Sequence, residues 1–250
     1  LAPLWGPSEL TFARVWAGEA EAQQIFWQLR VPRVGCAYLV GAILAVAGLV
    51  FQTLFRNPLA TPFTLGVSSG AALCAALYAW TGLAFSWIGL AGSTIAAFFG
   101  AVLTLGAVLF ISRRRVGSSS ESILIIGMML SFFFSSILMF VQYLSDVSQV
   151  FRMTRWLMGG LEASNQHSLW LIALFGLPLM IIGILYHREL DVLQIGDELA
   201  AARGVEVEAV RWKMLVCSSL MVAVVVACAG PIGFVGIMIP SVVEYFVGSA

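Results

Sequence analysis

The stretch that decides the fold runs from residue 34 to residue 62 and reads VGCAYLVGAILAVAGLVFQTLFRNPLATP. Its first part, residues 34–55, carries no charged side chain and exceeds the roughly 20 apolar residues that a helix needs to cross a bilayer. Its second part, residues 56–62, holds two prolines, which end one helix and begin another, and Asn57, which can satisfy freed backbone groups. The stretch therefore predicts a membrane-spanning helix that turns tightly into a second one.

Similar apolar runs recur along the chain. Of its 250 residues, 60% are hydrophobic and 10% are charged, whereas soluble domains carry about 25% charged residues. The further runs lie at residues 62–80, 84–111, 122–144, 168–186, 214–229 and 231–247. The sequence thus predicts an all-α fold, a polytopic transmembrane helical bundle, with residues 1–250 forming a single transmembrane domain.

Glycine and proline interrupt these runs at specific places. Pro178 lies inside the fifth run and is expected to kink it. Gly66 and Gly70 form a GxxxG pattern, which lets a neighbouring helix approach closely. The last run opens with GPIGFVG, which predicts a broken entry followed by a short helix or half-helix. The interrupting residues there are Gly230, Pro231, Gly233 and Gly236.

The basic residues predict an orientation, because cytoplasmic loops carry more Lys and Arg. If the runs are spans, one side holds Arg56, Arg113, Arg114, Arg115, Arg188, Arg203, Arg211 and Lys213. The other side holds Arg14, Arg30, Arg33, Arg152 and Arg155. The first side is therefore expected to be cytoplasmic. Residues 1–33, with short amphipathic pieces, would lie on the periplasmic or interfacial side, which requires an additional span before them and indicates a fragment of a longer protein.

Several function classes are disfavoured by what the runs lack. The six longer runs contain no Asp, Glu, Lys, Arg or His, whereas ion-coupled carriers need such titrating groups at membrane depth. The two histidines, His167 and His187, flank the fifth run at opposite ends, which does not suit a haem. The sequence has no GxxxxGK[ST] nucleotide loop, no protease motif and no CxxC pair, and its net charge is zero. We therefore expect no catalytic residue, no metal site, no cofactor and no nucleic-acid partner.

Three segments together resemble a known family. They are RVPR at residues 30–33 leading through Gly41, Gly48 and Gln52 to RNPLA at 56–60, LQIGDELA at 193–200 with Arg203 and Gly204, and GPIGFVG at 230–236 running on to Pro240. Their order and spacing from residue 26 to about residue 248 resemble the FecCD-type permeases. That family comprises the membrane subunits of ABC importers for iron–siderophore complexes, haem and cobalamin.

The resemblance implies an architecture and a set of partners. The family fold has ten helices per subunit, so about seven would be present here, without the first and the last two. A second permease subunit, forming a homodimer, a cytoplasmic ATP-binding subunit and a periplasmic substrate-binding protein would be the protein partners in the bacterial inner membrane. One departure concerns the family's Pro-His-x-x-Arg, which here reads PSVVE at residues 240–244. The Arg-to-Glu exchange at Glu244 puts local contacts, and activity, in doubt.

The loop at residues 187–213 is the principal candidate site. Mixed charge of this kind is usually a solvated linker. Gly196, however, ends one turn, and Asp197 can cap a short helix that continues to Gly204, as a docking element would require. The resemblance makes this loop the cytoplasmic coupling loop that meets the ATPase. Its expected coupling residues are Leu193, Gly196, Asp197, Glu198, Ala200, Arg203 and Gly204.

Other residues allow two interpretations. Arg30 and Arg33 suit interfacial anchors beside the first span, whereas the resemblance implies docking of the binding protein. The Met and Phe side chains of 122–144 either line a pathway or pack against helices and lipid. Turn residues expected to have structural roles are Arg56, Asn57, Pro58, Pro62, Gly66, Gly70, Gly230, Pro231, Gly233 and Gly236.

Taken together, the residues and the resemblance predict a permease subunit that moves an iron complex or cobalamin, driven by ATP hydrolysis in a separate chain. The alternative is a membrane scaffold or sensor that binds a soluble partner and transports nothing.

Overall fold

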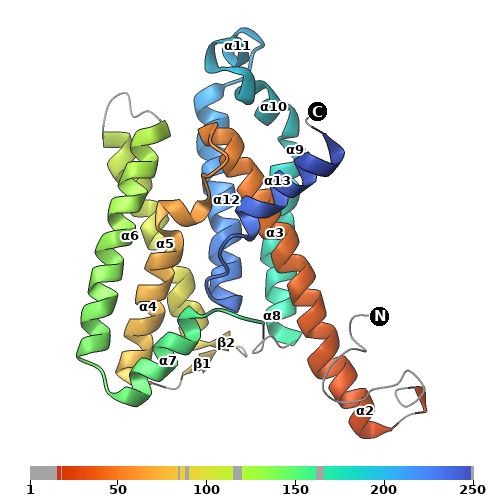
Figure 1. Ribbon diagram of the computed structural model, residues 1–250, viewed down its shortest axis with the longest axis vertical. Helices are drawn as coiled ribbons and strands as arrows, with labels where there is room; N and C mark the ends of the chain where they lie inside the picture. The colour runs from red at the N-terminus through yellow and green to blue at the C-terminus, as the bar shows by residue number, and fades with distance from the viewer. Residues whose placement is uncertain are drawn as a thin grey trace.

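The computed structural model describes residues 16–17, 19–83, 85–87, 90–114, 120–161 and 166–248. Within these ranges it is a bundle of helices aligned with the long axis of the molecule, with short elements gathered at the two ends (Figure 1). Five of the described helical runs are long and apolar enough to cross a membrane. The all-α transmembrane bundle predicted from the sequence is confirmed.

The first long run is continuous from Ala20 to Phe55. It comprises α2 (Ala20–Gln24), a π-helical turn η2 (Ile25–Arg30) and α3 (Val31–Phe55). The π turn ends two residues before Pro32, whose ring nitrogen cannot donate a helical hydrogen bond. The described part of 1–33 is thus largely a helix that runs straight into the first span.

A second π turn has the same relation to a proline. The fifth span comprises α8 (Gln166–Leu171), the π turn η4 (Ile172–Gly176) and α9 (Leu177–Leu185). Here too the π turn ends two residues before a proline, Pro178. The missing hydrogen bond of Pro178 is therefore accommodated by a wider turn within an unbroken helix.

The second and third spans begin later than their apolar runs. A 3₁₀ turn, η3 (Pro62–Leu65), and Gly66, whose φ is +80°, precede α4 (Val67–Thr81). Residues at the start of the run 84–111 form a small antiparallel pair, β1 (Ser86–Trp87) with β2 (Leu90–Ala91), and α5 (Gly92–Arg114) starts only after it. The Tyr78 hydroxyl accepts a hydrogen bond from the Phe85 N–H at 2.7 Å, which ties this pair to α4.

The fourth span and the segment after it complete one side of the bundle. The span is α6 (Ser120–Tyr143), and α7 (Val147–Leu157) lies between the predicted spans 122–144 and 168–186. The Gln149 side chain accepts from the Asp146 N–H at 3.0 Å and donates to the Trp80 carbonyl at 2.8 Å. The start of α7 is thereby held against the end of α4.

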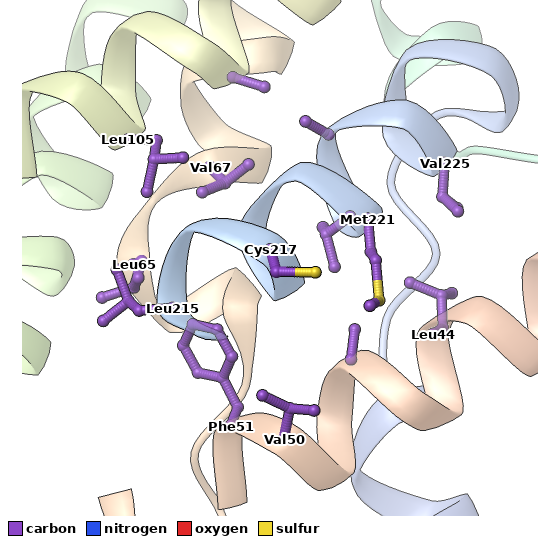
Figure 2. Packing of buried hydrophobic residues seen from close by; sticks show 14 of the residues in the cluster. Leu44, Val50, Phe51, Leu65, Val67, Leu105, Leu215, Cys217, Met221 and Val225 are labelled. Atoms are coloured by element: carbon purple, nitrogen blue, oxygen red, sulfur yellow. The ribbon is translucent and has the colours of Figure 1, made fainter. Parts of the chain in front are cut away.

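The core of the bundle is built around α12 (Val207–Ala229), which packs on α3, α4, α5 and α9. In its most apolar stretch 72% of the residues are buried. Leu215 and Met221 of α12 meet Leu44 and Phe51 of α3, and all four are fully or almost fully buried (Figure 2). Close packing of large apolar side chains therefore joins the first span to the sixth, which are far apart in sequence.

The last helix, α13 (Val235–Val247), starts well inside the molecule (Figure 1). Gly230 (φ +71°) ends α12, and Phe234 has a left-handed backbone (φ +66°) before α13 begins. A Cβ atom at Gly48 of α3 would overlap the backbone carbonyl of Gly236, so glycine at position 48 permits this crossing. A Cβ atom at Gly70 would similarly collide with Thr104 of α5.

Candidate functional site

The predicted coupling loop folds into a helical hairpin at one end of the bundle (Figure 1). Its two arms are α10 (His187–Ile195) and α11 (Asp197–Ala202), and Gly196, at φ +156°, joins them. The Val205 N–H donates to the Ala200 carbonyl at 3.0 Å, and Gly204 at φ +81° turns the chain toward α12. The hairpin is therefore a short, closed structural unit.

The hairpin residues divide into those that face the bundle and those that face outward. Leu190, Leu193 and Ala200 are buried. Glu198, Leu199, Arg203 and Gly204 are exposed, and Gly196 and Asp197 are half-buried. The predicted coupling set thus splits: Leu193, Asp197 and Ala200 attach the hairpin, while Glu198, Arg203 and Gly204 are available to a partner.

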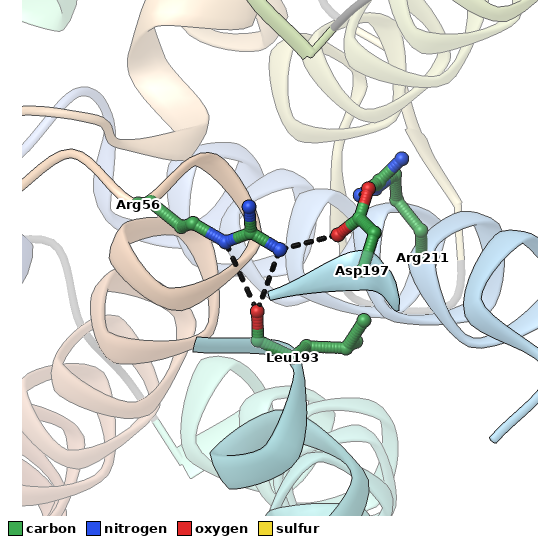
Figure 3. Close-up of polar contacts among 4 residues, drawn as sticks. All are labelled: Arg56, Leu193, Asp197 and Arg211. Carbon is green, nitrogen blue, oxygen red and sulfur yellow. Dashed lines mark hydrogen bonds and ion pairs between the residues drawn. The ribbon is translucent and has the colours of Figure 1, made fainter. Parts of the chain in front are cut away.

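A cluster of charged groups fastens this hairpin to the spans (Figure 3). Arg56, the last residue of the α3 end, donates from Nε and Nη2 to the Leu193 carbonyl at 3.0 and 2.8 Å. The same guanidinium forms an ion pair with the Asp197 carboxylate. Arg211, in the first turns of α12, pairs with the other carboxylate oxygen of Asp197 at 2.8 Å. One carboxylate therefore links α3, α11 and α12.

The charges in this cluster stabilise one another. The hydrogen bond from Arg211 and the attraction of both guanidinium groups hold the pKa of the Asp197 carboxyl below its usual value, against an opposing effect of burial. The side chains of Arg56, Asp197 and Arg211 are 44%, 45% and 23% exposed, so water screens the attraction in part. Asp197 is therefore ionised throughout the physiological pH range.

The last turn of α3 makes further polar contacts beside this cluster. The Gln194 amide of α10 donates to the buried Thr53 hydroxyl at 3.0 Å. The Gln52 amide donates to the Pro58 carbonyl at 2.9 Å and contacts the Gly236 carbonyl at 3.5 Å. The end of α3 is consequently a junction of the hairpin, the turn at 57–61 and the start of α13.

The turn after Arg56 is ordered by its own asparagine. The Asn57 N–H donates to the Gln52 carbonyl at 3.1 Å, and the Asn57 side chain accepts from the Leu59 N–H at 2.9 Å. Pro58 is exposed and Pro62 is buried. Arg56 itself has a left-handed backbone (φ +46°), a conformation that is uncommon for residues other than glycine.

Sequence reasoning missed the partnership of Arg56 and Arg211 with Asp197. Arg56 was predicted to belong to a turn, and Asp197 to a helix cap that a partner could reach. The two residues are separated by 141 positions, and no local pattern pairs them. The available signal was a basic residue at a predicted cytoplasmic span end facing a loop with six acids.

The opposite end of the bundle carries the other basic candidates (Figure 1). Arg30 ends η2 and is half-buried, and Arg33 lies in the first turn of α3 and is exposed. Arg152 and Arg155 on α7 line a cavity of about 400 Å³ together with Trp156, Gly159, Gly160 and Gly230. This end therefore exposes positive charge beside a hollow. The contact of Gly230 with Gly159 fits glycine alone, because a Cβ atom would come 2.8 Å from the Gly159 Cα.

One face of α6 is exposed and rich in Met and Phe. Met129, Phe132, Met139 and Phe140 have exposed fractions between 62% and 74%. The Ser131 hydroxyl bonds back to the Gly127 carbonyl at 2.9 Å, and Ser131 and Ser135 line a cavity of about 310 Å³ with Phe63 and Ser68. Ser131 therefore both hydrogen-bonds to its own helix and lines a cavity.

The departure at residues 240–244 lies on an exposed surface. Ser241 and Glu244 of α13 are exposed, and the Ser241 hydroxyl donates to the Ile237 carbonyl at 3.2 Å. Among the described residues, no three His, Cys, Asp or Glu side chains gather as a metal site would require.

Comparison with known proteins places this architecture. The model of the FecCD transport family matches residues 1–250. The hemin transport system permease HmuU of Yersinia pestis is 33% identical over 98% of this chain and 74% of its own length. The molybdate import permease MolB of Haemophilus influenzae is 37% identical over 91% of this chain and 66% of its own length. The vitamin B12 import permease BtuC of Klebsiella pneumoniae is 35% identical, covering 90% of this chain and 66% of that protein.

A solved structure of a metal-chelate type ABC transporter in an inward-facing conformation superposes with a TM-score of 0.80. It is 34% identical and covers 92% of this chain and 72% of that one. The chain is therefore a multi-pass protein of the bacterial inner membrane that spans about two thirds to three quarters of these relatives. By its matching family model and these relatives, it belongs to the FecCD transport family.

Proposed function

We propose that this chain is the membrane-spanning permease subunit of a binding-protein-dependent ABC importer, driven by ATP hydrolysis in a separate cytoplasmic subunit. The observation that carries the proposal is the hairpin α10–α11, which attaches to the bundle on one face and exposes Glu198, Arg203 and Gly204 on the other. A short rigid element of this kind can receive a push from a soluble motor and pass it to the spans.

The cargo is proposed to be an iron complex, such as a siderophore or haem, or cobalamin. Relatives named for hemin, vitamin B12 and iron chelatin support this range, and a relative named for molybdate widens it. Because ligands this different share one family, selectivity is expected to reside largely in the substrate-binding protein.

The route for the cargo is proposed to lie between two copies of the chain. The Met and Phe face of α6 is an unpartnered apolar face of a described span: only 17% of the most apolar stretch of α6 is buried, the same share as in Gln166–Leu185. A homodimer formed along α6 would cover part of this face and leave flexible, apolar side chains around a bulky ligand. The opposite, basic end, including Arg30 and Arg33, would orient the periplasmic binding protein, since charge steers association more than it adds affinity.

Co-purification from membranes tests the central claim. The full-length protein, expressed with its ATP-binding subunit, should retain that subunit in detergent. Glu198→Lys and Arg203→Glu should each weaken retention, because both side chains are exposed on the hairpin. Glu21→Lys, an equal charge reversal on α2 at the other end, is the matched control and should not.

Uptake in proteoliposomes separates transport from the alternative. With the binding protein and cargo outside and ATP inside, an importer accumulates cargo, whereas a scaffold or sensor binds its partner without accumulation. Retention of the ATP-binding subunit without ATP-dependent uptake would contradict transport and favour the scaffold.

A further inference from the structure

We propose that Arg56 is a coupling residue: through Asp197 and the Leu193 carbonyl it transmits displacement of the hairpin to the turn at 57–61 and to the start of α13. The inference rests on the proposed ATP-driven function and assigns a role within it to a residue that the sequence places in a simple turn.

The Arg56 side chain contacts both arms of the hairpin. The Arg56 guanidinium bonds to the last turn of α10 at the Leu193 carbonyl and to the first residue of α11, Asp197. These two points flank Gly196, the only residue between the arms. A change in the angle between the arms therefore moves at least one partner of Arg56.

Arg56 also stands where the first span meets the turn that leads to α4. It is the residue at which α3 ends, with a left-handed backbone, and the turn toward α4 begins directly after it. Force on its side chain acts on the backbone of the Asn57–Leu59 turn, because that turn is hydrogen-bonded to Gln52 one helical turn earlier. Gln52 also contacts the Gly236 carbonyl, so the displacement reaches α13.

The cluster contains more positive than negative charge. Two guanidinium groups share one carboxylate, and the Arg211 Nε is buried with no hydrogen-bond partner among the described residues. Neutralising Asp197 would leave two like charges close together, one on α3 and one on α12. The carboxylate is thus the element that keeps the hairpin, the first span and the sixth span in register.

This arrangement also separates two roles within the hairpin. Glu198 and Arg203 are exposed and therefore available to the ATP-binding subunit. Asp197, one residue from Glu198, is engaged inside the chain. Changing Glu198 should therefore impair assembly, whereas changing Asp197 or Arg56 should impair the transfer of motion after assembly.

The test compares uptake per ATP hydrolysed in the reconstituted complex. Arg56→Ala and Asp197→Asn should both retain the ATP-binding subunit and binding-protein-stimulated hydrolysis, while cargo accumulated per ATP falls roughly tenfold. Arg56→Lys keeps the charge but not the two-armed grip of a guanidinium, so its ratio should fall between wild type and alanine. Lys213→Ala removes a positive charge from an exposed position on α12, outside the hairpin, and should match wild type.

The double variant Arg56→Ala/Asp197→Asn completes the cycle. If the two residues act through one another, it should be no worse than the more impaired single variant. Multiplying defects, or an unchanged ratio in Arg56→Ala, would overturn the inference. Loss of the ATP-binding subunit from Arg56→Lys would overturn it too, because Arg56 would then shape the docking face instead. Failure of the wild-type complex to hydrolyse or transport would refute the proposed function and not this inference alone.

Discussion

The helices α6 and α12 are both apolar, both long enough to span, and opposite in their surroundings. In their most apolar stretches 17% of the residues of α6 are buried against 72% in α12. Composition alone therefore identifies a span, but it does not say whether the span lies in the core of the bundle or on its surface. The contrast predicts that α12 determines stability and that α6 is free to serve a partner or a ligand.

Replacing one methionine on each helix by alanine tests this contrast most directly. Met221 of α12 is fully buried and Met129 of α6 is 66% exposed. Met221→Ala should cost about 3 kcal/mol because it leaves a cavity in a close-packed core. Met129→Ala should change the stability of the monomer by less than about 0.5 kcal/mol. Thermal unfolding in detergent measures both effects. Equal losses of stability would refute the assignment of α12 to the core and α6 to the surface.

A glycine pair on α3 sharpens the same comparison at the level of backbone contacts. A Cβ atom at Gly48 would overlap the Gly236 carbonyl, whereas one at Gly41 would meet nothing within 4 Å. Gly48→Ala should therefore cost about 2 kcal/mol by displacing α13. Gly41→Ala should be neutral or slightly stabilising, because alanine favours helices. A neutral Gly48→Ala in thermal unfolding would mean that α13 does not cross α3 at this point.

The charged cluster at the start of α12 should contribute less than the core. Asp197→Asn should cost about 1 kcal/mol, because its partners are partly exposed to water. The bound guanidinium groups lower the pKa of Asp197, so its contribution is present above the usual carboxyl pKa and is lost only as pH falls through the lowered value. The difference in melting temperature between Asp197→Asn and wild type should thus stay constant from pH 6 to 8. A difference that grew within that range would point to another titrating group.

The smallest effect is expected at the end of α13. Ser241 is exposed and its hydroxyl bonds only to its own helix at the Ile237 carbonyl. Ser241→Ala should change stability by less than about 0.5 kcal/mol. A large loss in the melting temperature of the full-length protein would show that this face of α13 is packed in the complete subunit.

The sequence was a good guide to the spans and a poor guide to their ends. A run of apolar residues has a length requirement that physics fixes, so 34–55 and 214–229 were identified within the helices α3 and α12. The run 84–111 was assigned too early a start, because Ser86–Trp87 and Leu90–Ala91 are apolar enough for a helix yet pair as strands. The helix α7 was missed because a search for apolar runs does not detect an amphipathic helix, whose polar face lowers its average hydropathy.

Only part of the candidate site could be predicted from the sequence. The predicted cap is wrong: Gly196 is the N-cap residue of α11, no side chain caps that helix, and Asp197 is its first residue. The short helix itself could be inferred from its local residues, since glycine and alanine have known preferences. The partners of Asp197 could not, because pairing across 141 residues depends on how the spans pack. Core packing places the end of α3 beside α12, and that placement brings Arg56 to the carboxylate.

The two π turns change which residues share a face of each helix. Each π turn contains one extra residue. Residues beyond the turn are therefore rotated about the helix axis by about 100° from their positions in a regular helix. A helical wheel drawn through Ala20–Phe55 in one piece would therefore assign Ala22 of α2 to the wrong sector. Accessibility scans along these two spans should show a periodicity that jumps at η2 and η4.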